Sequence, residues 1–182
     1  MDIISAAIPD VLIMSPKVFK DDRGFFFEIF NRQTLCNIGI NYEFVQDNLS
    51  SSRLGVLRGL HYQIRYPQGK LVTVLKGEVF DVAVDLRRSS PYFGKHVACR
   101  LSEDKRKFLW IPPGFAHGFL VLSETAEFFY KVSDYYHPEA ERTVLWNDEN
   151  LGIDWPIEPS MEILLSPKDQ EGLPLKLAEV YP

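Results

Sequence analysis

The chain has 182 residues, 46% of them hydrophobic and 13% aromatic, and a net charge of −5 at pH 7. This length fits one domain with a sizeable core, and the apolar content excludes an intrinsically disordered chain. The acidic balance argues against nucleic acid or an anionic membrane as the main partner, although a few local Arg and Lys side chains can still hold a phosphate compound. We therefore expect a single domain over residues 1–182 that binds neither nucleic acid nor a membrane.

The amino terminus and the two cysteines predict a cytoplasmic protein. Residues 1–17 form too short an apolar run for a signal peptide or a membrane span, and they are interrupted by Pro9 and Pro16 and lack a basic start. Cys36 and Cys99 lie far apart and form no CxxC motif, which favours free thiols in a reducing compartment.

The beginning of the chain predicts an arm, a turn and one helix. Residues 8–19 alternate loosely and contain two prolines, which is typical of an edge strand or an arm. Residues 21–24 predict a turn, and the phenylalanine-rich residues 25–30 predict a strand that must be covered on both faces. Residues 31–38 predict a short helix, capped by the asparagine at its start and by the glycine after its end.

From residue 42 onward, short strands alternate with Gly, Pro and Ser. Residues 71–75 and 78–86 predict a β-hairpin around Lys76-Gly77. Asp81 falls on an otherwise apolar face of the second strand, and it needs a partner because an unpaired buried charge is costly. Further strands are expected at residues 97–101, 107–111, 118–122 and 127–133.

This series of regular short strands with little helix predicts an all-β fold. The first interpretation is a jelly-roll barrel with short peripheral helices and an N-terminal arm. The proline-rich residues from 151 onward are expected to wrap over the barrel.

Polar residues recur between apolar ones, at strand spacing, in the stretch FVQDNLSSSRLGVLRGLHYQIRYPQGK of residues 44–70. A surface loop does not need the apolar residues and a core strand does not need the polar ones, so the stretch predicts the wall of a pocket. Strict alternation places Gln46, Asn48 and Arg58 on the face opposite His61. If Arg58 and His61 line one pocket, the strand must break its parity, and Gly59 is the expected place for a bulge or bend.

The four histidines do not form a metal motif. A metal-binding cupin jelly roll typically has two His two residues apart, a Glu soon after and a later His, whereas Gln63 follows His61 at that spacing. We therefore expect neither a metal nor another cofactor. His61 and His117 lie in glycine-flanked apolar segments, which favours a site over two structural histidines. Tyr130 by itself is interpreted as a core tyrosine.

A series of motifs in a fixed order carries a family resemblance: DDRGFFFE, FVQDN, GVLRGLHYQ, QGKLV, GEVFDVAVDLR, IPPGFAHGF, YK, LWND and LSPKD. From Ile8 to Asp169 the chain resembles the dTDP-4-dehydrorhamnose 3,5-epimerases. The resemblance implies a metal-free cupin jelly roll that forms a homodimer. It also implies epimerisation at C3 and C5 of dTDP-4-dehydro-6-deoxy-D-glucose, which gives dTDP-4-dehydro-L-rhamnose, a precursor of dTDP-L-rhamnose for cell-surface polysaccharide.

This reaction explains the residue types in the motifs. The 4-keto group acidifies the C–H bonds on either side of it, and inversion needs a base on one face of the ring, an acid on the other and a group that stabilises the enolate. By resemblance, His61 is the base, Asp169 orients its imidazole and Tyr130 is the acid. Lys70 is then the enolate stabiliser, and Asp81 is its expected partner on the inner face.

The resemblance implies substrate-binding roles for a larger set: Arg23, Phe26, Glu28, Gln46, Asp47, Asn48, Arg58, Asp81, His117, Tyr136, Glu141 and Lys168. Arg23 and Arg58 suit the diphosphate, because the planar guanidinium offers a fork of donors. Tyr136 would stack on thymine. In the family the N-terminal arm crosses to the other subunit, so Arg23, Phe26 and Glu28 would complete the site of that subunit.

Two departures from the family pattern leave substrate preference open. Thr73 follows the KLV motif where many members have Arg, and residues 64–67 differ from the more common Pro-Pro version, so diphosphate contacts or loop closure could differ. The same motifs also fit a C3-only epimerase, a cupin sugar ketoisomerase, or a catalytically silent sugar-nucleotide-binding cupin. The complete set of His61, Tyr130, Asp169 and Lys70 argues against the silent protein.

Overall fold

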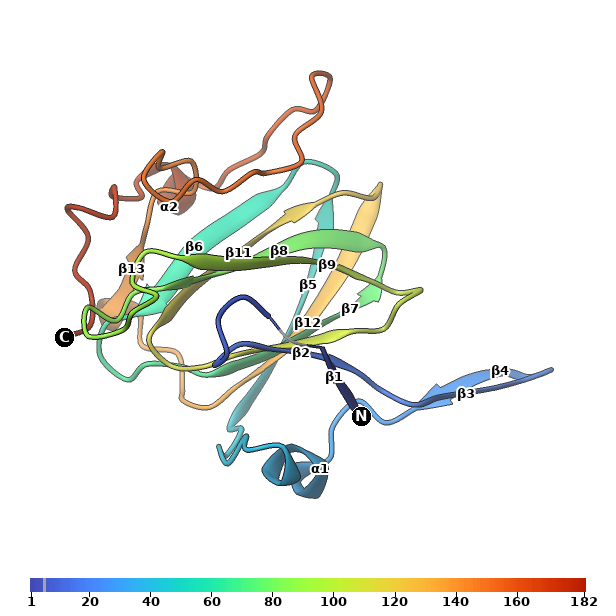
Figure 1. Cartoon of the computed structure of the whole chain (residues 1–182). Coiled ribbons are helices and arrows are strands. Elements are labelled where there is room, and N and C mark those ends of the chain that lie inside the picture. Colours follow the sequence, from blue (N-terminus) through green and yellow to red (C-terminus); the bar gives the residue numbers. More distant parts are fainter. Residues whose placement is uncertain (5) are drawn as a thin grey trace.

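Two antiparallel β-sheets packed against each other form most of the computed structural model, which describes residues 1–4 and 6–182 (Figure 1). The six-stranded sheet contains, in spatial order, β1 (Asp2–Ile4), β2 (Leu12–Ser15), β10 (Phe108–Ile111), β7 (Lys70–Lys76), β12 (Thr125–Val132) and β5 (Gln46–Arg53). The five-stranded sheet contains β13 (Glu141–Thr143), β6 (Leu57–Gln63), β11 (Phe115–Val121), β8 (Glu78–Asp85) and β9 (His96–Ser102). The predicted all-β jelly-roll architecture is confirmed.

The five-stranded sheet is buried on both faces, as β8 illustrates. Val79 and Ala83 face the cluster between the two sheets, whereas Val82 and Val84 face a second cluster on the outside of the sheet. The irregular segment from Leu151 to the C-terminus covers that outer cluster, as expected from its composition. A strand covered on both sides has apolar residues on both faces, which explains the nearly continuous apolar run of β8.

The predicted hairpin of residues 71–86 is wrong, because β7 and β8 belong to different sheets. β7 pairs with β10 and β12, whereas β8 pairs with β9 and β11. Gly77 joins them with a φ of 77°, and a Cβ there would lie 2.1 Å from the carbonyl oxygen of Thr125. The glycine does mark a bend, but a bend does not decide whether its two strands pair with each other or with strands from later in the chain.

The edge strand expected within residues 8–19 lies one place inside the sheet. β2 pairs with β10 on one side and with β1 on the other, so β1 forms the edge. Three residues are too few for an alternation pattern, and the sequence therefore predicts no strand at β1. Pro16 directly follows β2, where its missing N–H costs no pairing.

The predicted helix of residues 31–38 is α1 (Arg32–Asn37). The side chain of Asn31 accepts a 3.2 Å hydrogen bond from the N–H of Thr34, and Gly39 follows the helix with a φ of 91°. Two further short helices are η1 (Pro138–Ala140) and α2 (Pro167–Gln170). All of these helices lie at the periphery of the sheets, as predicted (Figure 1).

Strands β3 (Val18–Asp21) and β4 (Gly24–Phe27) form a hairpin that projects away from the barrel (Figure 1). Its tip is the turn predicted at residues 21–24. Phe25 and Phe26 are 57% and 68% exposed, whereas Phe27 packs against Phe108. We expected this phenylalanine-rich strand to be covered on both faces, but within one chain Phe25 and Phe26 remain exposed.

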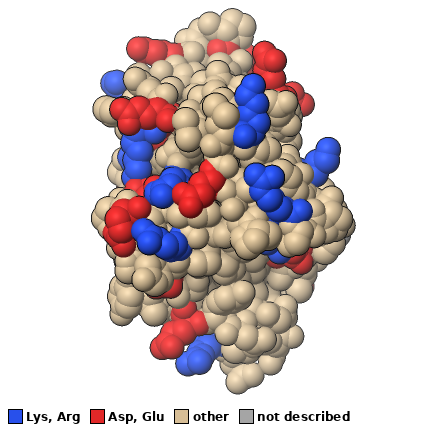
Figure 2. Space-filling model, turned by 90° about the vertical axis from the view of Figure 1, so that its left-hand side faces the viewer, with Lys and Arg blue, Asp and Glu red and all other residues tan. Residues whose placement is uncertain are grey.

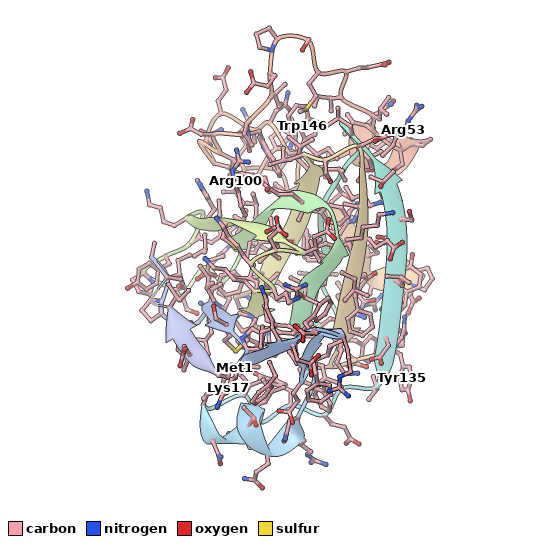
Figure 3. All side chains as sticks on the ribbon, turned by 90° about the vertical axis from the view of Figure 1, so that its right-hand side faces the viewer. Met1, Lys17, Arg53, Arg100, Tyr135 and Trp146 are labelled. Carbon is pink, nitrogen blue, oxygen red and sulfur yellow. The ribbon has the colours of Figure 1, made fainter. Side chains whose placement is uncertain are left out.

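The surface carries charges of both signs. Acidic and basic side chains are interspersed on the face shown in Figure 2, with no continuous basic area there. On the opposite side, Arg53 and Tyr135 mark the two ends of the paired strands β5 and β12 (Figure 3). Within the described part of the chain, no helix is long and apolar enough to cross a membrane.

Candidate active site

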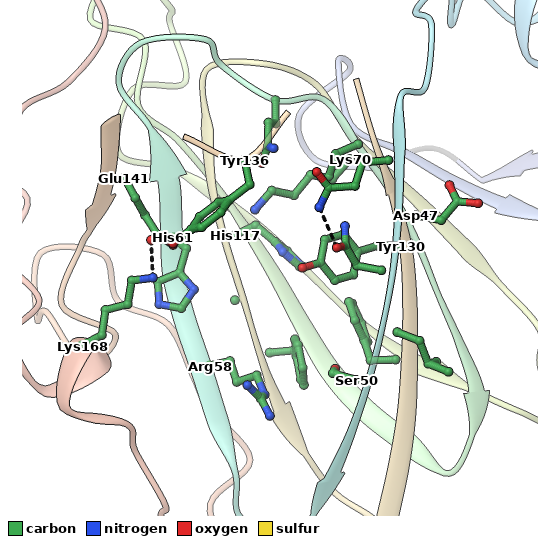
Figure 4. Close-up of a pocket in the computed structure, with 18 residues that line it drawn as sticks. Asp47, Ser50, Arg58, His61, Lys70, His117, Tyr130, Tyr136, Glu141 and Lys168 are labelled. Atoms are coloured by element: carbon green, nitrogen blue, oxygen red, sulfur yellow. Dashed lines mark hydrogen bonds and ion pairs between the residues drawn. The ribbon is translucent and has the colours of Figure 1, made fainter. Parts of the chain in front are cut away.

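A cavity of about 560 Å³ lies between the two sheets (Figure 4). Its walls come from β5, β7 and β12 of one sheet and from β6 and β11 of the other. Most of the predicted site residues line it: Gln46, Asp47, Asn48, Arg58, His61, Lys70, His117, Tyr130, Tyr136, Glu141 and Lys168. The fold thus assembles in one place residues that are scattered over most of the sequence.

His61 on β6 contacts Asp169 on α2, from near the other end of the chain. Nε2 of His61 lies 2.7 Å from Oδ1 of Asp169, so the carboxylate contacts the imidazole directly. The His61 side chain is 25% exposed, whereas that of Asp169 is 3% exposed. The imidazole is therefore accessible from the cavity while its carboxylate partner is covered.

Asp169 is held by a second set of donors. Its Oδ1 accepts a 2.9 Å hydrogen bond from the N–H of Gly59, and its Oδ2 accepts from the N–H and the hydroxyl of Ser166 at 3.1 and 2.5 Å. Burial would raise the pKa of this carboxyl, but the contacts with His61, Ser166 and Gly59 outweigh burial and hold the pKa well below its usual range. Asp169 is therefore a fixed anion behind His61.

The predicted break of parity at Gly59 is confirmed. Arg58 and His61 both line the cavity, and the register between β6 and β11 shifts between His117 and Phe119. Gly59 has a φ of 126°, and a Cβ there would lie 2.5 Å from the Cα of Gly118. Only glycine fits this position, because the backbone conformation and the space both exclude a side chain.

Tyr130 on β12 and His61 on β6 face the cavity from opposite sheets, and Lys70 on β7 extends into the space between them (Figure 4). Burial lowers the pKa of Lys70 to about 8, although the charges of Glu141 and Asp81 favour its protonated form. Burial also raises the pKa of Tyr130, against the opposing effect of Arg58. At neutral pH, Tyr130 therefore carries its proton.

The inner-face partner of Asp81 is His117 rather than Lys70. Nε2 of His117 lies 3.0 Å from both carboxylate oxygens of Asp81, and both side chains are buried. Burial lowers the pKa of His117, against the opposing effect of Asp81. Asp81 acts on Lys70 through its charge only, because β8 is paired directly with β11, which carries His117.

Three residues form a polar cluster at one side of the cavity. Glu141 accepts a 2.7 Å hydrogen bond from the hydroxyl of Tyr136 and forms an ion pair with Lys168 (Figure 4). The hydrogen bond to Glu141 and burial raise the pKa of Tyr136. Lys168 precedes Asp169 on α2, so the helix that positions the carboxylate behind His61 also contributes to this cluster.

The residues predicted on β5 divide between the two faces of the strand. Gln46 donates a 2.8 Å hydrogen bond to Asn48, and both side chains are on the cavity face. Asp47 is a different case, because its carboxylate forms an ion pair with Lys131 and points away from the cavity (Figure 4). A substrate contact by the carboxylate of Asp47 is therefore not supported, since alternation in β5 turns it to the outer face.

Comparison with known proteins agrees with this geometry. A family model described as dTDP-4-dehydrorhamnose 3,5-epimerase matches residues 5–176. The dTDP-4-dehydrorhamnose 3,5-epimerase of Pseudomonas aeruginosa is 56% identical over 177 residues, which cover 97% of each protein. The chain belongs to the dTDP-4-dehydrorhamnose 3,5-epimerase family.

Solved structures of the epimerase family share the fold. A dTDP-6-deoxy-D-glucose-3,5-epimerase from Legionella pneumophila, in complex with dTDP-4-keto-L-rhamnose, is 51% identical with a TM-score of 0.95, and the match covers 98% of this chain and 94% of that one. A 3'-monoepimerase from Streptomyces bikiniensis, in complex with dTDP-quinovose, is 31% identical with a TM-score of 0.86, over 93% of this chain and 86% of that one. The cupin jelly roll is therefore common to epimerases that bear different names.

The three predicted residues of the N-terminal arm do not reach the cavity of their own chain. Arg23 and Phe26 lie on the projecting hairpin, where Arg23 is paired with Asp21. Glu28 follows the hairpin and accepts a 2.9 Å hydrogen bond from Asn31. Within this epimerase-family chain, these three residues are separate from the residues that surround His61.

The remaining cavity residues were not predicted: Leu49, Ser50, Gln68, Gly118, Phe119, Phe128 and Val132. Ser50 shares a strand face with Asn48, and Phe128 shares one with Tyr130, so two-residue alternation from the predicted residues would have found them. Ser52, further along the same face of β5, accepts hydrogen bonds of 3.3 and 3.1 Å from Arg58. Gln68 comes from a loop, and it is the first residue of the QGKLV motif, which was a signal for it.

The described residues contain no group of three or more His, Cys, Asp and Glu side chains that could hold a metal ion. His61 and His117 each pair with a single carboxylate instead. The cavity therefore offers proton-transfer groups and cations from its own side chains.

Proposed function

We propose that this protein inverts C3 and C5 of dTDP-4-dehydro-6-deoxy-D-glucose to give dTDP-4-dehydro-L-rhamnose, in the synthesis of dTDP-L-rhamnose. The observation that carries the proposal is the arrangement of His61 and Tyr130 on opposite walls of one cavity, with Lys70 between them. Inversion at carbon requires a base and an acid on opposite faces of the sugar ring, and this arrangement provides them.

The proposed first step is removal of the proton at C3 or C5 by the imidazole of His61. Asp169 stabilises the imidazolium that forms, because its carboxylate is ionised and lies 2.7 Å away. The electron pair of the broken C–H bond moves into an enolate whose negative charge is on O4. Lys70, with a pKa of about 8, is still mainly protonated at pH 7 and stabilises that oxygen.

The proposed second step is protonation of the same carbon from the opposite face. The hydroxyl of Tyr130 delivers the proton, the C=C bond of the enolate returns to a C=O bond at C4, and the configuration at the carbon is inverted. Proton exchange with water then returns a proton to the hydroxyl of Tyr130 and removes the proton from the imidazole of His61. The same two groups serve both carbons if the ring rebinds or turns between the two inversions.

For the nucleotide, we propose that the cavity residues outside the reacting centre hold the dTDP group. Arg58 supplies donors for the diphosphate, and Tyr136 supplies an aromatic ring for thymine at the side of the cavity. Support comes from the Legionella pneumophila and Streptomyces bikiniensis proteins, whose structures contain dTDP-sugars. Gln46, Asn48, His117, Glu141 and Lys168 complete the proposed binding set.

The test is proton exchange in deuterium oxide, followed by NMR of the sugar. Incubation of the dTDP-keto-sugar with the protein should remove the C–H signals at both C3 and C5. Loss at C3 alone would identify a C3 epimerase, the alternative that the resemblance to the 3'-monoepimerase favours. A shifted carbonyl carbon would identify a ketoisomerase. Binding of dTDP by the protein without any proton exchange would identify a catalytically silent binding protein.

We further propose a homodimer in which the β3–β4 hairpin of each subunit reaches the cavity of the other. The support is the exposed face of Phe25 and Phe26 and the distance of Arg23 from its own cavity. Mixing two inactive variants, His61→Ala and Arg23→Ala, tests this proposal. Exchanged arms regenerate one intact site in each mixed dimer and restore activity, whereas arms that act on their own subunit restore none.

The chain is proposed to act as a single domain over residues 1–182, in the cytoplasm. The C-terminal segment closes the outer core of the five-stranded sheet, and Ile8 and Val11 near the N-terminus belong to the core between the sheets, so both parts of the chain take part in one unit. Cys36 and Cys99 are free thiols, which suits a reducing compartment. Limited proteolysis should release no stable fragment, and cell fractionation should recover the protein with cytoplasmic markers.

A further inference from the structure

Gln63 is a buried polar residue to which the proposed chemistry gives no role. It follows His61 by two residues on β6, and it is only 4% exposed. Its side-chain amide makes three hydrogen bonds: Nε2 donates to the carbonyls of Tyr66 at 2.8 Å and Tyr135 at 3.2 Å, and Oε1 accepts from the N–H of His137 at 2.7 Å. A buried amide with this many partners specifies the position of whatever it contacts.

Two of these bonds bracket Tyr136. The carbonyl of Tyr135 belongs to the peptide group before Tyr136, and the N–H of His137 belongs to the peptide group after it. One amide side chain therefore fixes both peptide planes at the α-carbon of Tyr136. The amide has only one workable orientation, because reversing it would place its NH₂ group against the N–H of His137.

The segment that carries Tyr136 depends on such tertiary contacts. Residues 133–137 lie between β12 and η1 and belong to no strand or helix. Gln68 adds bonds to the same segment, from its Nε2 to the carbonyls of Asp134 at 2.9 Å and Tyr135 at 3.2 Å. The ring of His137 also stacks on Tyr66, with centroids 4.2 Å apart.

The position of Gln63 is itself fixed by neighbouring strands and by the C-terminal segment. It lies in β6, opposite Glu141 of β13, and its carbonyl accepts a 2.6 Å hydrogen bond from the hydroxyl of Tyr181 in the C-terminal segment. Glu141 in turn accepts the hydroxyl proton of Tyr136. Neighbouring positions of β6 and β13 thus fix the backbone and the hydroxyl of the same tyrosine, as a rigid scaffold should.

We propose that Gln63 is a positioning residue for substrate binding, which holds Tyr136 where its ring meets the nucleobase of the dTDP-sugar. The inference rests on the proposed function, because it takes the nucleobase to lie against Tyr136. In this proposal, β6 carries two neighbouring functional residues. His61 faces the reacting carbons of the sugar, and Gln63 positions Tyr136, which binds the nucleobase. Gln63 acts on affinity, since its amide contacts the Tyr136 segment and not the imidazole.

The test begins with Gln63→Met, which keeps the length of the side chain and removes all three hydrogen bonds. The KM for the dTDP-keto-sugar and the Kd for dTDP should rise about 5- to 50-fold, with kcat changed less than about twofold. Val79→Ala serves as control: it lowers stability in the core, away from Tyr136, and should leave KM unchanged. Gln63→Glu, which keeps the acceptor and loses both donors, repeats the test if the methionine variant is poorly folded.

A double-mutant cycle separates positioning from a general structural role. In the Tyr136→Ala background, Gln63→Met should add almost nothing to KM, because the residue through which it acts is already gone. Additive effects, a loss in kcat instead of KM, or an unchanged Kd for dTDP in a folded Gln63 variant would each overturn the inference. Failure of the wild-type protein to bind dTDP or to exchange protons would instead overturn the proposed function.

Discussion

Two histidine–aspartate pairs lie side by side in the cavity wall, and they differ in exposure and in the origin of the aspartate. His61 and His117 are opposite each other in the register of β6 and β11. The partner of His117 is Asp81 on the adjacent strand β8, and the two side chains are 8% and 0% exposed. The partner of His61 is Asp169 on α2, and the His61 side chain remains 25% exposed.

The difference shows how one pair of residue types can serve two purposes. A pair made within a single sheet is rigid and excludes water, so burial lowers the pKa of His117 and its imidazole serves as a neutral hydrogen-bonding group in the wall. In the His61–Asp169 pair, the carboxylate comes from α2, outside the sheet, and one edge of the imidazole remains exposed to the cavity. Of the two histidines, His61 is the one that combines an accessible ring with a fixed anion behind it, which is what a general base needs.

The largest expected effect distinguishes the two histidines directly. His61→Ala should lower the rate of exchange at both C3 and C5 by about 10²–10⁴-fold, because it removes the proposed general base. Folding and the affinity for dTDP should be retained, since His61 is on the wall and not in the core. NMR exchange rates, thermal unfolding and dTDP titration measure the three quantities. Exchange at the wild-type rate in this variant would overturn the assignment of the base.

The second effect concerns the buried pair. Asp81→Ala should lower the free energy of unfolding by about 3 kcal/mol, because it leaves the imidazole of His117 without a partner in a buried site. Asp154→Ala, at an exposed position, is the matched control and should stay within about 0.5 kcal/mol of the wild type. Urea unfolding compares the variants. Equal stabilities would mean that the His117–Asp81 contact contributes nothing to the fold.

The smallest effect tests how the charge of Asp81 acts on Lys70. Because the pKa of Lys70 is lowered to about 8, its ammonium is lost as the pH rises through that value, and kcat/KM should decline above it. Asp81→Asn removes a negative charge that favours the protonated form, so it should move this decline to lower pH. Asp154→Asn should leave the profile in place. A decline that does not respond to Asp81→Asn would show that the two groups are not coupled.

Local patterns in the sequence predicted a good part of the fold. The alternation in β8 and β12 and the cap at Asn31 are short-range features, and each occurs where it was expected. The break of parity predicted at Gly59 is also present, because a two-residue period fixes the face of every side chain unless the backbone is distorted. The capping box of Ser166 and Asp169 is a further local signal, and it marks the start of α2.

Strand partners and residue partners could not be predicted in this way. The glycine at residue 77 marks a bend, yet β7 and β8 belong to two sheets, because β7 pairs with β10 and β12 and β8 pairs with β9 and β11. Asp81 needed a buried partner, but its alternation did not say whether His117 or Lys70 would be closer. Phe25 and Phe26 show the same limit. Their apolar side chains predicted that the strand would be buried, but the sequence did not indicate which part of the protein would bury them.

The sequence by itself determined the strand-rich class, the family resemblance and the candidate reactive side chains, because these follow from local period and from motifs. The tertiary structure decided which of them meet. It brought Asp169 from α2 to His61 on β6, set Tyr130 on the opposite wall and left Gln63 to hold the segment of Tyr136. The physical reason is that these contacts join segments far apart in the chain, and a local pattern carries no information about which distant segment packing will place beside it.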